Sequence, residues 1–342
     1  MPDTLAKLGA GRRERWLVTG AAGFIGSHLV EALLRGGHQV RAVDNFATGH
    51  LANIDEVRRL VGGAADRLEF IEADVADERA CQSMVAGVDR VLHQAALGSV
   101  PRSIADPVGS FRANVDGFVH LLDASRRAGV RRFVYASSSS VYGDSPELPK
   151  REANCGRVLS PYAATKAADE LFADVFARTY GIECVGLRYF NVFGPRQDPA
   201  GAYAAVVPKW VAAMLEGKPV SINGDGKTSR DFCYVANAVQ ANIRAALVET
   251  LPSPHEVYNV AVGEQTSLLE LFRLIRDSLA KVDNSVASCE PAFGDFRKGD
   301  VRHSLADIGK ARRGIGYQPT HTVAAGMAEA IGWYVDRARA RA

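Results

Sequence analysis

The sequence has few cysteines, no long apolar run and no excess of charge of either sign. Its five cysteines are an odd number spread over 342 residues, a pattern that fits neither a disulfide framework nor a zinc site. Reduced thiols of this kind are typical of a cytoplasmic protein, which is the localisation we expect. Lys and Arg total 41 against 39 Asp and Glu, so the net charge of +2 indicates neither nucleic acid nor a membrane surface as a partner.

Apolar segments long enough to cross a membrane are also missing. The longest apolar runs are far shorter than the roughly 20 residues that a bilayer-spanning helix needs. The first 16 residues contain no apolar core of a signal peptide, so we expect none. The chain does have an ordinary balance of 47% hydrophobic and 23% charged residues, which predicts a folded protein of one large or two smaller domains.

Short apolar runs alternate with helical patterns through the first half of the chain. The predicted strands are Arg15–Thr19, Gln39–Val43, Leu68–Ile71, Arg90–His93 and Arg132–Ala136. The predicted helices between and after them are Phe24–Arg35, Leu51–Leu60, Glu78–Val85, Pro107–Ala128 and Pro161–Tyr180, with a further strand at Glu183–Leu187. This alternation predicts an α/β fold with a doubly wound parallel sheet, whose strands read as continuous apolar runs because helices cover both faces.

After about Phe190 the pattern changes to short segments separated by Gly, Pro and Asp. Helical patterns follow at Val206–Glu216, Ala236–Glu249, Leu268–Leu279 and Val323–Ala338. We therefore expect a first domain over residues 1–190 and a smaller α/β substrate lobe mainly over residues 191–342. The lobe is not expected to be continuous in sequence, so later segments can return to the first domain.

A glycine turn joins the first predicted strand to the first helix. Gly20, Gly23 and Gly26 have the spacing G-x-x-G-x-x-G. Gly20 permits a tight turn, Gly23 lets the backbone approach a pyrophosphate, and Gly26 allows close packing of helix on strand. The free N–H groups of the helix N-terminus then face the phosphates. In this position the turn predicts a dinucleotide site of the Rossmann type.

Asp44, at the end of the second strand, favours NAD over NADP. It stands where an acidic side chain accepts hydrogen bonds from the adenosine ribose, and it would repel a 2′-phosphate. Arg41 lies nearby and is the argument for NADP. Asp74 and Val75 follow the third strand and are expected at the adenine, and Gln94, Ala95 and Ala96 follow the fourth, where small residues leave room for the cofactor.

A tyrosine and a lysine one turn apart predict the catalytic groups. Tyr162 and Lys166 lie on one face of a helix, and the serines Ser137–Ser140 end a strand at the edge where ligands of parallel sheets bind. Tyrosine has an ordinary pKa of about 10, so it needs a nearby ammonium and an oxidised nicotinamide to act as a base. A serine hydroxyl can steer the substrate oxygen and share its proton.

Together these features resemble the extended short-chain dehydrogenase/reductases over nearly the whole chain. Four further segments resemble the UDP-hexose 4-epimerases, and more closely the bacterial UDP-N-acetylglucosamine 4-epimerases: Asp44–Gly49, His93–Ser103, Leu187–Gly194 and Gly224–Phe232. The resemblance implies that Tyr162 is the base, that Lys166 binds the nicotinamide ribose, and that Ser138 hydrogen-bonds the sugar. It also implies a homodimer formed by the helices Pro107–Ala128 and Pro161–Tyr180.

The resemblance implies further contacts to the cofactor and to the substrate. Those to NAD add Phe24, Ile25, Asn45, Asn114, Tyr189 and Val192. Those to a UDP-sugar are Ser99, Ser139, Ser140, Asn191, Val207, Lys209, Arg230, Arg297, Asp300 and Ser304. Among these, Arg230 and Arg297 are expected to hold the pyrophosphate through charge-assisted hydrogen bonds. Ser304, four residues after Asp300, corresponds to the position beside the sugar's 2-substituent, where a small residue leaves room for an acetamido group.

Three other functions remain open at this stage. A nucleotide-sugar 4,6-dehydratase uses the same oxidation at C4, but its acidic pair is replaced here by Ser139 and Ser140. A UDP-glucuronate epimerase or decarboxylase would need a cationic contact to the C5 carboxylate. A non-catalytic NAD-binding regulatory protein would not need Ser138, Tyr162 and Lys166 together.

Overall fold

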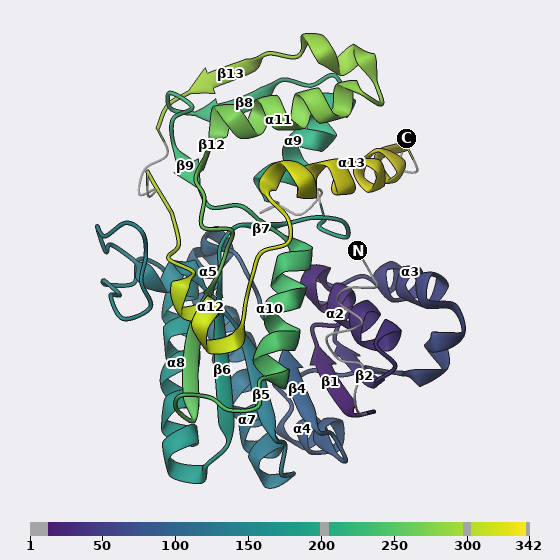
Figure 1. Ribbon diagram of the computed structural model, residues 1–342, viewed down its shortest axis with the longest axis vertical. Helices are drawn as coiled ribbons and strands as arrows, with labels where there is room; N and C mark the ends of the chain where they lie inside the picture. Colours follow the sequence, from purple (N-terminus) through teal and green to yellow (C-terminus); the bar gives the residue numbers. More distant parts are fainter. Residues whose placement is uncertain (1–12, 199–204, 297–301, 340–342) are drawn as a thin grey trace.

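A seven-stranded parallel sheet forms the lower part of the molecule in the computed structural model, which describes residues 13–198, 205–296 and 302–339 (Figure 1). The strand order is β11-β6-β5-β4-β1-β2-β3. The strands are β1 (Arg15–Thr19), β2 (Gln39–Asp44), β3 (Leu68–Glu72), β4 (Arg90–His93), β5 (Arg132–Ser138), β6 (Glu183–Tyr189) and β11 (His255–Val260). The order places the carboxyl ends of β1, β4 and β5 side by side, where ligands of such sheets bind.

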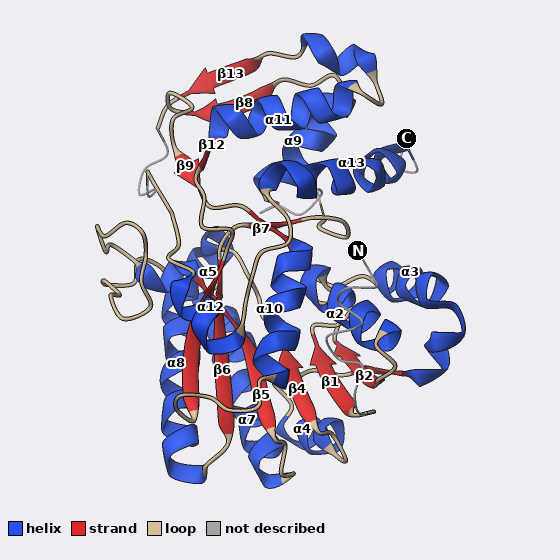
Figure 2. Cartoon of the chain, in the orientation of Figure 1, coloured by secondary structure: helices blue, strands red, loops and turns tan. Residues whose placement is uncertain are grey.

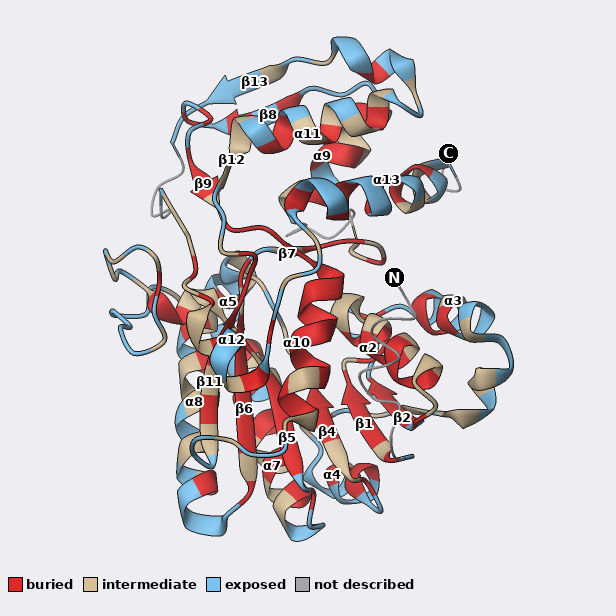
Figure 3. Ribbon diagram, viewed as in Figure 1, coloured by how far each residue is buried: buried red, intermediate tan, exposed pale blue. Residues whose placement is uncertain are grey.

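Helices cover both faces of the sheet, as a doubly wound fold requires. Because side chains alternate along a strand, Trp16 and Val18 of β1 join one hydrophobic core and Leu17 joins the other. On the first face lie α2 (Phe24–Arg35), α3 (Leu51–Val61) and α10 (Val235–Leu247), and on the second lie α4 (Glu78–Val85), α7 (Gly117–Arg127) and α8 (Pro161–Tyr180). Figure 3 shows the strands between these helices as buried.

A smaller lobe of short strand pairs and helices stands above the carboxyl edge of the sheet (Figure 2). Its strand pairs are β7 (Val192–Phe193) with β10 (Cys233–Tyr234), β9 (Ser229–Arg230) with β12 (Thr266–Ser267), and β8 (Val220–Asn223) with β13 (Pro291–Gly294). Its helices are α9 (Val206–Leu215), α11 (Leu268–Ala280) and α13 (Val323–Arg339). Strand β11, helix α10 and helix α12 (Gly309–Ile315) return to the sheet.

The helix predicted over Pro107–Ala128 is confirmed as a helical segment over residues 107–127, but a π turn interrupts its α-helical hydrogen bonding. Helix α5 (Val100–Ala105) precedes it, α6 (Pro107–Phe111) is short, and residues Arg112–Asp116 form a π-helical turn before α7. A π turn inserts a residue into the helical ladder and is frequent at functional sites. Here it carries Asn114, which is fully buried.

Strand β11 was not predicted, because its sequence His-Glu-Val-Tyr-Asn-Val is half polar and lies far along the chain from its neighbour β6. Short 3₁₀ turns complete the described structure at η1 (Gly62–Arg67), η3 (Ser139–Tyr142) and η4 (Asn284–Ser288). None of the helices in the described ranges is both long and apolar enough to span a bilayer.

Candidate active site

The glycine turn between β1 and α2 brings backbone rather than side chains to the carboxyl edge of the sheet. Gly20 has a φ of 64°, and a Cβ there would lie 2.7 Å from the backbone nitrogen of Ala95. A Cβ at Gly26 would lie 2.0 Å from the carbonyl oxygen of Gly20. Gly23 is the N-cap of α2 and offers no side-chain cap, so the first N–H groups of the helix stay free for an anion.

A cavity of ≈ 660 Å³ extends from this turn to the first turn of α8. Every residue predicted to contact the cofactor lines it, except Asn114 and Val192. The predicted residues that do so are Gly20, Gly23, Phe24, Ile25, Gly26, Asp44, Asn45, Asp74, Val75, Gln94, Ala95, Ala96, Tyr162, Lys166 and Tyr189. The structure thus brings the glycine turn and the Tyr-Lys pair, more than 130 residues apart in sequence, to one cavity.

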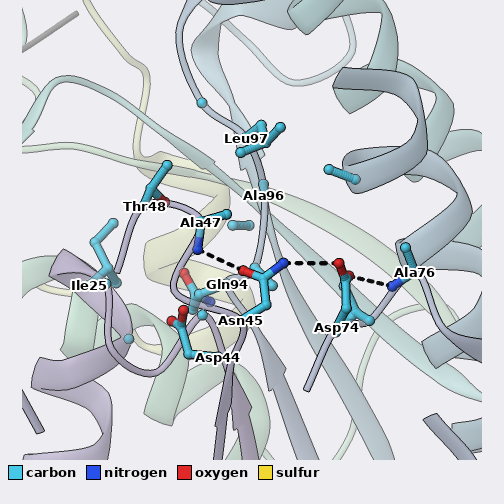
Figure 4. A pocket seen from close by; sticks show the side chains of 18 of the residues that line it. Ile25, Asp44, Asn45, Ala47, Thr48, Asp74, Ala76, Gln94, Ala96 and Leu97 are labelled. Carbon is cyan, nitrogen blue, oxygen red and sulfur yellow. Dashed lines mark hydrogen bonds between the residues drawn. The ribbon is translucent and has the colours of Figure 1, made fainter. Parts of the chain in front are cut away.

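Acidic side chains form the end of the cavity near β2 and β3 (Figure 4). The Asp44 carboxylate accepts hydrogen bonds from the N–H groups of Ala22 (2.9 Å) and Phe46 (2.8 Å). Burial raises the pKa of Asp44, and these backbone donors oppose the rise. Asn45 donates from Nδ2 to Asp74 (3.0 Å), which fixes both side chains at the cavity wall.

Arg41 is turned away from this acidic end. Its Nη1 donates to the carbonyl oxygens of Met84 (2.8 Å) and Ala86 (3.0 Å) at the end of α4, and its Nε donates to Glu69 (2.9 Å). The guanidinium thus caps the carbonyl groups at the end of α4. The argument for NADP from Arg41 therefore fails, because its charge does not line the cavity.

Helix α8 begins so that Tyr162 and Lys166 both enter the cavity. Ser160 caps the helix by accepting from the N–H of Ala163 (3.1 Å), and Ser103 accepts from the N–H of Tyr162 (3.0 Å). Lys166 is 2% exposed, and its Nζ donates to the buried carboxylate of Asp169 (3.1 Å). Burial acts to lower the pKa of Lys166, but the charge and hydrogen bond of Asp169, together with the charges of Tyr162 and Glu170, raise that pKa.

Asn114 lies behind the cavity wall rather than in it. Its side chain accepts from the N–H of Leu97 (2.7 Å) and donates to the carbonyl of Leu97 (3.2 Å) and to the hydroxyl of Thr165 (3.0 Å). It therefore ties the loop after β4 to helix α8, one residue before Lys166. We interpret Asn114 as a support for the cavity.

The four serines at the end of β5 have different environments. Ser137 lines the cavity, but its hydroxyl donates to Glu170 (2.5 Å). Ser138 accepts from the N–H of Ser140 (3.1 Å). The Ser140 hydroxyl is buried and has no hydrogen-bond partner among the described residues. Ser139 begins the 3₁₀ turn that follows.

Three residues predicted to hold the substrate meet around β9 in the smaller lobe. Asn191 donates from Nδ2 to the carbonyl of Asp231 (3.2 Å), beside Arg230. Ser304 donates its N–H to the carbonyl of Ser229 (3.1 Å), and Arg230 donates to the same carbonyl (2.9 Å). These contacts bring Asn191, Arg230 and Ser304 together although they are up to 113 residues apart in sequence.

The other predicted substrate residues are placed differently. Val207 is buried in the core of the smaller lobe and Lys209 is exposed on α9. Ser99 caps α5 by accepting from the N–H of Arg102 (3.3 Å). Neither these three nor Val192 is among the described residues that line the cavity, and the same holds for Ser138, Ser139, Ser140, Asn191, Arg230 and Ser304. Arg297 and Asp300 lie outside the described residues.

Comparison with known proteins places the chain in a family. Residues 16–261 match the model of the NAD dependent epimerase/dehydratase family. A UDP-glucose 4-epimerase of Mycolicibacterium smegmatis is 37% identical over 95% of this chain and all of its own length. A UDP-N-acetylglucosamine 4-epimerase structure from Methanobrevibacter ruminantium, in complex with UDP-N-acetylmuramic acid, is 36% identical with a TM-score of 0.87, covering 96% of this chain and 100% of that one. A Thermus thermophilus UDP-glucose 4-epimerase structure in complex with NAD is 34% identical with a TM-score of 0.79, covering 94% and 99%.

The chain belongs to the NAD-dependent epimerase/dehydratase family.

Members of this family act on nucleotide sugars with NAD, and this chain is such an NAD-dependent epimerase or dehydratase. The cavity fits that cofactor. Neither Gly20 nor Gly26 has room for a Cβ, the N-terminus of α2 is uncapped, and Asp44 offers a carboxylate at the cavity wall, away from Arg41. These groups suit a pyrophosphate and a ribose with free hydroxyls. Arg112, on the π turn, adds a second cation to the cavity beside Lys166.

Sequence reasoning missed a buried polar network that fixes the cavity side chains of this epimerase/dehydratase. Asn242 of α10 donates to the Tyr189 hydroxyl (2.7 Å) and accepts from Nε2 of Gln94 (3.0 Å), while the Tyr189 hydroxyl donates to Oε1 of Gln94 (3.0 Å). Thr19 and His93 pair similarly, 2.7 Å apart. Burial, followed by the charge of Lys166, lowers the pKa of His93 to about 3, so this imidazole is neutral. No local pattern marks Asn242, because its partners come from β4 and β6.

Replacing Gly26 by Ala is expected to destabilise the protein and weaken its hold on NAD. The added Cβ would meet the Gly20 carbonyl, so α2 must move away from β1, at a cost of about 1–3 kcal/mol. Thermal unfolding and the NAD released on denaturation measure both effects. The control is Gly332→Ala in α13, where a Cβ meets nothing within 4 Å. If Gly26→Ala kept the unfolding temperature and the NAD content of the natural protein, the assignment of the glycine turn as the NAD-binding turn would be contradicted.

Proposed function

We propose that this protein inverts C4 of UDP-sugars, and that its preferred pair is UDP-N-acetylglucosamine and UDP-N-acetylgalactosamine. The observation that carries the proposal is the single cavity joining the glycine turn to Tyr162 and Lys166. The similarity to the UDP-N-acetylglucosamine 4-epimerase of Methanobrevibacter ruminantium supports the same reading.

Tyr162 is the proposed base for the sugar 4-hydroxyl. The Lys166 ammonium, buried on the same helix face, favours the phenolate form that such a base needs. Bound NAD supplies the hydride acceptor at C4 and returns the hydride, so the reaction has no net redox change. Ser138 is expected to orient the same oxygen and share its proton.

Inversion needs a sugar that rotates while its nucleotide stays fixed. In the proposal the 4-keto sugar turns about its link to the pyrophosphate and accepts the hydride and proton on its other face. Arg230 and Asn191, tied to β9, are the proposed holding groups, with Arg297 as a further pyrophosphate contact. Charge-assisted hydrogen bonds from arginine suit this role because they fix the phosphates geometrically.

Elimination of water is the main competing reaction for this family. It requires an acid and a base near C5 and C6. Ser139 and Ser140 stand beside the proposed catalytic serine where a dehydratase is expected to carry an acidic pair, so elimination lacks its proton-transfer groups.

The decisive experiment is product analysis with several UDP-sugars and no added cofactor. The purified protein is incubated with UDP-N-acetylglucosamine, UDP-glucose or UDP-glucuronate, and the products are resolved by chromatography and proton NMR. We expect UDP-N-acetylgalactosamine, with a higher kcat/KM than for the UDP-glucose reaction. A 4-keto-6-deoxy product, or turnover of UDP-glucuronate alone, would contradict the proposal.

Tyr162→Phe is expected to keep the fold and lose most activity. The ring still fills its place, and only proton transfer is lost, typically about a hundredfold to ten-thousandfold in rate. Initial rates with UDP-N-acetylglucosamine measure the loss, and circular dichroism checks the fold. Tyr180→Phe, at the exposed end of the same helix, is the matched control. Near-normal turnover in Tyr162→Phe would show that another group is the base.

Ser304→Tyr is expected to remove activity on acetylated sugars selectively. A ring beside the sugar's 2-substituent would overpack an acetamido group, which costs about 1–3 kcal/mol, or roughly a 5- to 150-fold loss in kcat/KM. Some activity on UDP-glucose should survive, and Ser304→Ala should keep both activities. Equal losses on both kinds of sugar, or no loss on either, would defeat the assignment of Ser304.

We also propose that the protein is a homodimer, joined through an apolar face on α5, α6 and α8. This face contains Ile104, Val108, Phe111, Leu171 and Phe172, all exposed, with Ile104 and Leu171 each 64% exposed. Helices α5 and α6 pack along α8, so these side chains lie on neighbouring helices. Apolar patches of this kind mark interaction surfaces. A second copy of α8 and of the helical segment 107–127 would then complete a four-helix bundle.

Leu171→Glu is expected to convert the dimer to a monomer. A carboxylate at the centre of an apolar interface loses its hydration without a partner. Light scattering during size exclusion should give twice the 36.7 kDa chain mass for the natural protein and the single mass for the variant. Val282→Glu, exposed on the smaller lobe, should stay dimeric. A monomeric natural protein would overturn this proposal.

A further inference from the structure

A buried carboxylate stands one turn beyond Lys166, on the same face of α8. Asp169 is fully buried, and its Oδ2 accepts from Lys166 Nζ at 3.1 Å. Its other oxygen, Oδ1, is also buried and has no hydrogen-bond partner among the described residues. Side chains three residues apart meet on a helix surface, so the contact follows from the sequence spacing.

Burying such a pair is expensive and needs a reason. Each ion loses its hydration, and mutual attraction repays that loss only in favourable geometry with further hydrogen bonds. Oδ1 of Asp169 has no such hydrogen bond within the described residues, so the carboxylate is not present for stability alone. Within the described ranges, its one hydrogen-bonded partner is the ammonium that lines the cavity together with Tyr162.

We propose that Asp169 is a positioning residue that holds the Lys166 ammonium in the cavity and, through its own charge, sets the pH at which Tyr162 loses its proton. This proposal rests on the proposed function in one respect, the role of Tyr162 as the base. The effect of Asp169 on the ionisation of Tyr162 does not depend on which sugar is bound.

Other ionisable groups packed around α8 are either paired elsewhere or neutral, so they do not act on Lys166 as Asp169 does. Glu170, the next residue, is engaged by both Arg188 of β6 (2.7 Å) and Ser137 of β5 (2.5 Å). His93 of β4 is neutral, and burial raises the pKa of Tyr135 of β5 well above its ordinary value, so that it is neutral as well.

Charged groups on other elements near α8 have partners of their own. On β11, His255 contacts Asp174 (3.8 Å) and the Tyr135 hydroxyl (2.9 Å), and burial lowers its pKa. On α7, Asp123 pairs with Arg126 (2.6 Å). Arg112 of the π turn lines the cavity and, within the described part of the chain, makes no hydrogen bond or ion pair with Asp169.

The sign of the effect follows from the charges. A negative charge at Asp169 partly cancels the Lys166 ammonium as seen from Tyr162, and so opposes ionisation of the phenol. Seven residues of helix separate Tyr162 from Asp169, about 10 Å along the axis. At an effective dielectric of about 20, one charge at that distance shifts a pKa by about 1 unit. Burial raises the pKa of Asp169 itself to about 6, so the charge is present above that pH.

The test compares Asp169→Asn with the natural protein across pH. The amide keeps the volume and an oxygen acceptor for Lys166, but removes the charge. We expect the acid limb of the kcat/KM profile, where the base becomes protonated, to move to lower pH by about 1 unit. The plateau should change only a few-fold. Asp174→Asn removes the same charge from an exposed position of the same helix and should leave the profile unchanged.

A direct titration separates this proposal from the proposed function. Ultraviolet absorbance of tyrosinate is followed against pH in Asp169→Asn and in the natural protein, and the matching Tyr162→Phe background is subtracted from each. A lower pKa for Tyr162 in Asp169→Asn supports the proposal even if the protein acts on a different sugar. An unshifted Tyr162 titration, with activity merely reduced at every pH, would overturn it. Absence of epimerase activity with a shifted titration would overturn the function and leave Asp169's role standing.

Discussion

Helix α2 approaches β1 so closely that no Cβ fits at Gly26, and the position of the whole site depends on this contact. A Cβ there would lie 2.0 Å from the Gly20 carbonyl. The contact directs the uncapped N-terminus of α2 to the carboxyl edge of the sheet, where β4 and β5 deliver Gln94 and the serines. The cavity therefore forms where backbone amides, strand ends and the first turn of α8 converge.

The smaller lobe is anchored to the same helix. His28 of α2 donates from Nε2 to the carbonyl of Pro195 (2.9 Å), and its Nδ1 faces the Arg196 guanidinium (3.1 Å). Burial, followed by the charge of Arg196, lowers the pKa of His28 well below its ordinary value, so the imidazole is neutral and can accept from Arg196. Tyr334 of α13 donates to the Gly194 carbonyl (2.9 Å) at the same point. A movement of α2 would therefore be transmitted to both the cofactor cavity and the lobe above it.

The features that sequence reasoning predicted are those encoded by short spacing. The glycine turn, Asp44 at a strand end and the Tyr162–Lys166 pair each fit within one element and its adjoining turn, so local geometry fixes them. The doubly wound sheet was likewise predicted from the alternation of apolar runs and helices. Strand β11 and Asn242 were not predicted, because their roles arise only when distant segments pack together.

Asp169 and Asn114 show a different limit of prediction from sequence. Asp169 is one turn from Lys166 in the sequence, but a charged residue in a helix is ordinarily solvated, and only burial reveals its pairing. Asn114 was expected to touch the cofactor, yet the π turn directs its amide to Leu97 and Thr165. Sequence patterns thus predicted side chains that meet in one cavity, while the groups that hold these side chains in place became visible only in three dimensions.

The most direct test of the account follows the hydrogen at C4. UDP-N-acetylglucosamine carrying deuterium at C4 is incubated with the protein in ordinary water without added cofactor. If one cavity oxidises and reduces the same carbon, UDP-N-acetylgalactosamine should retain the deuterium at C4, and no label should reach the solvent. Product that has lost the C4 deuterium, or substrate that exchanges hydrogen at C5 and loses water, would contradict it.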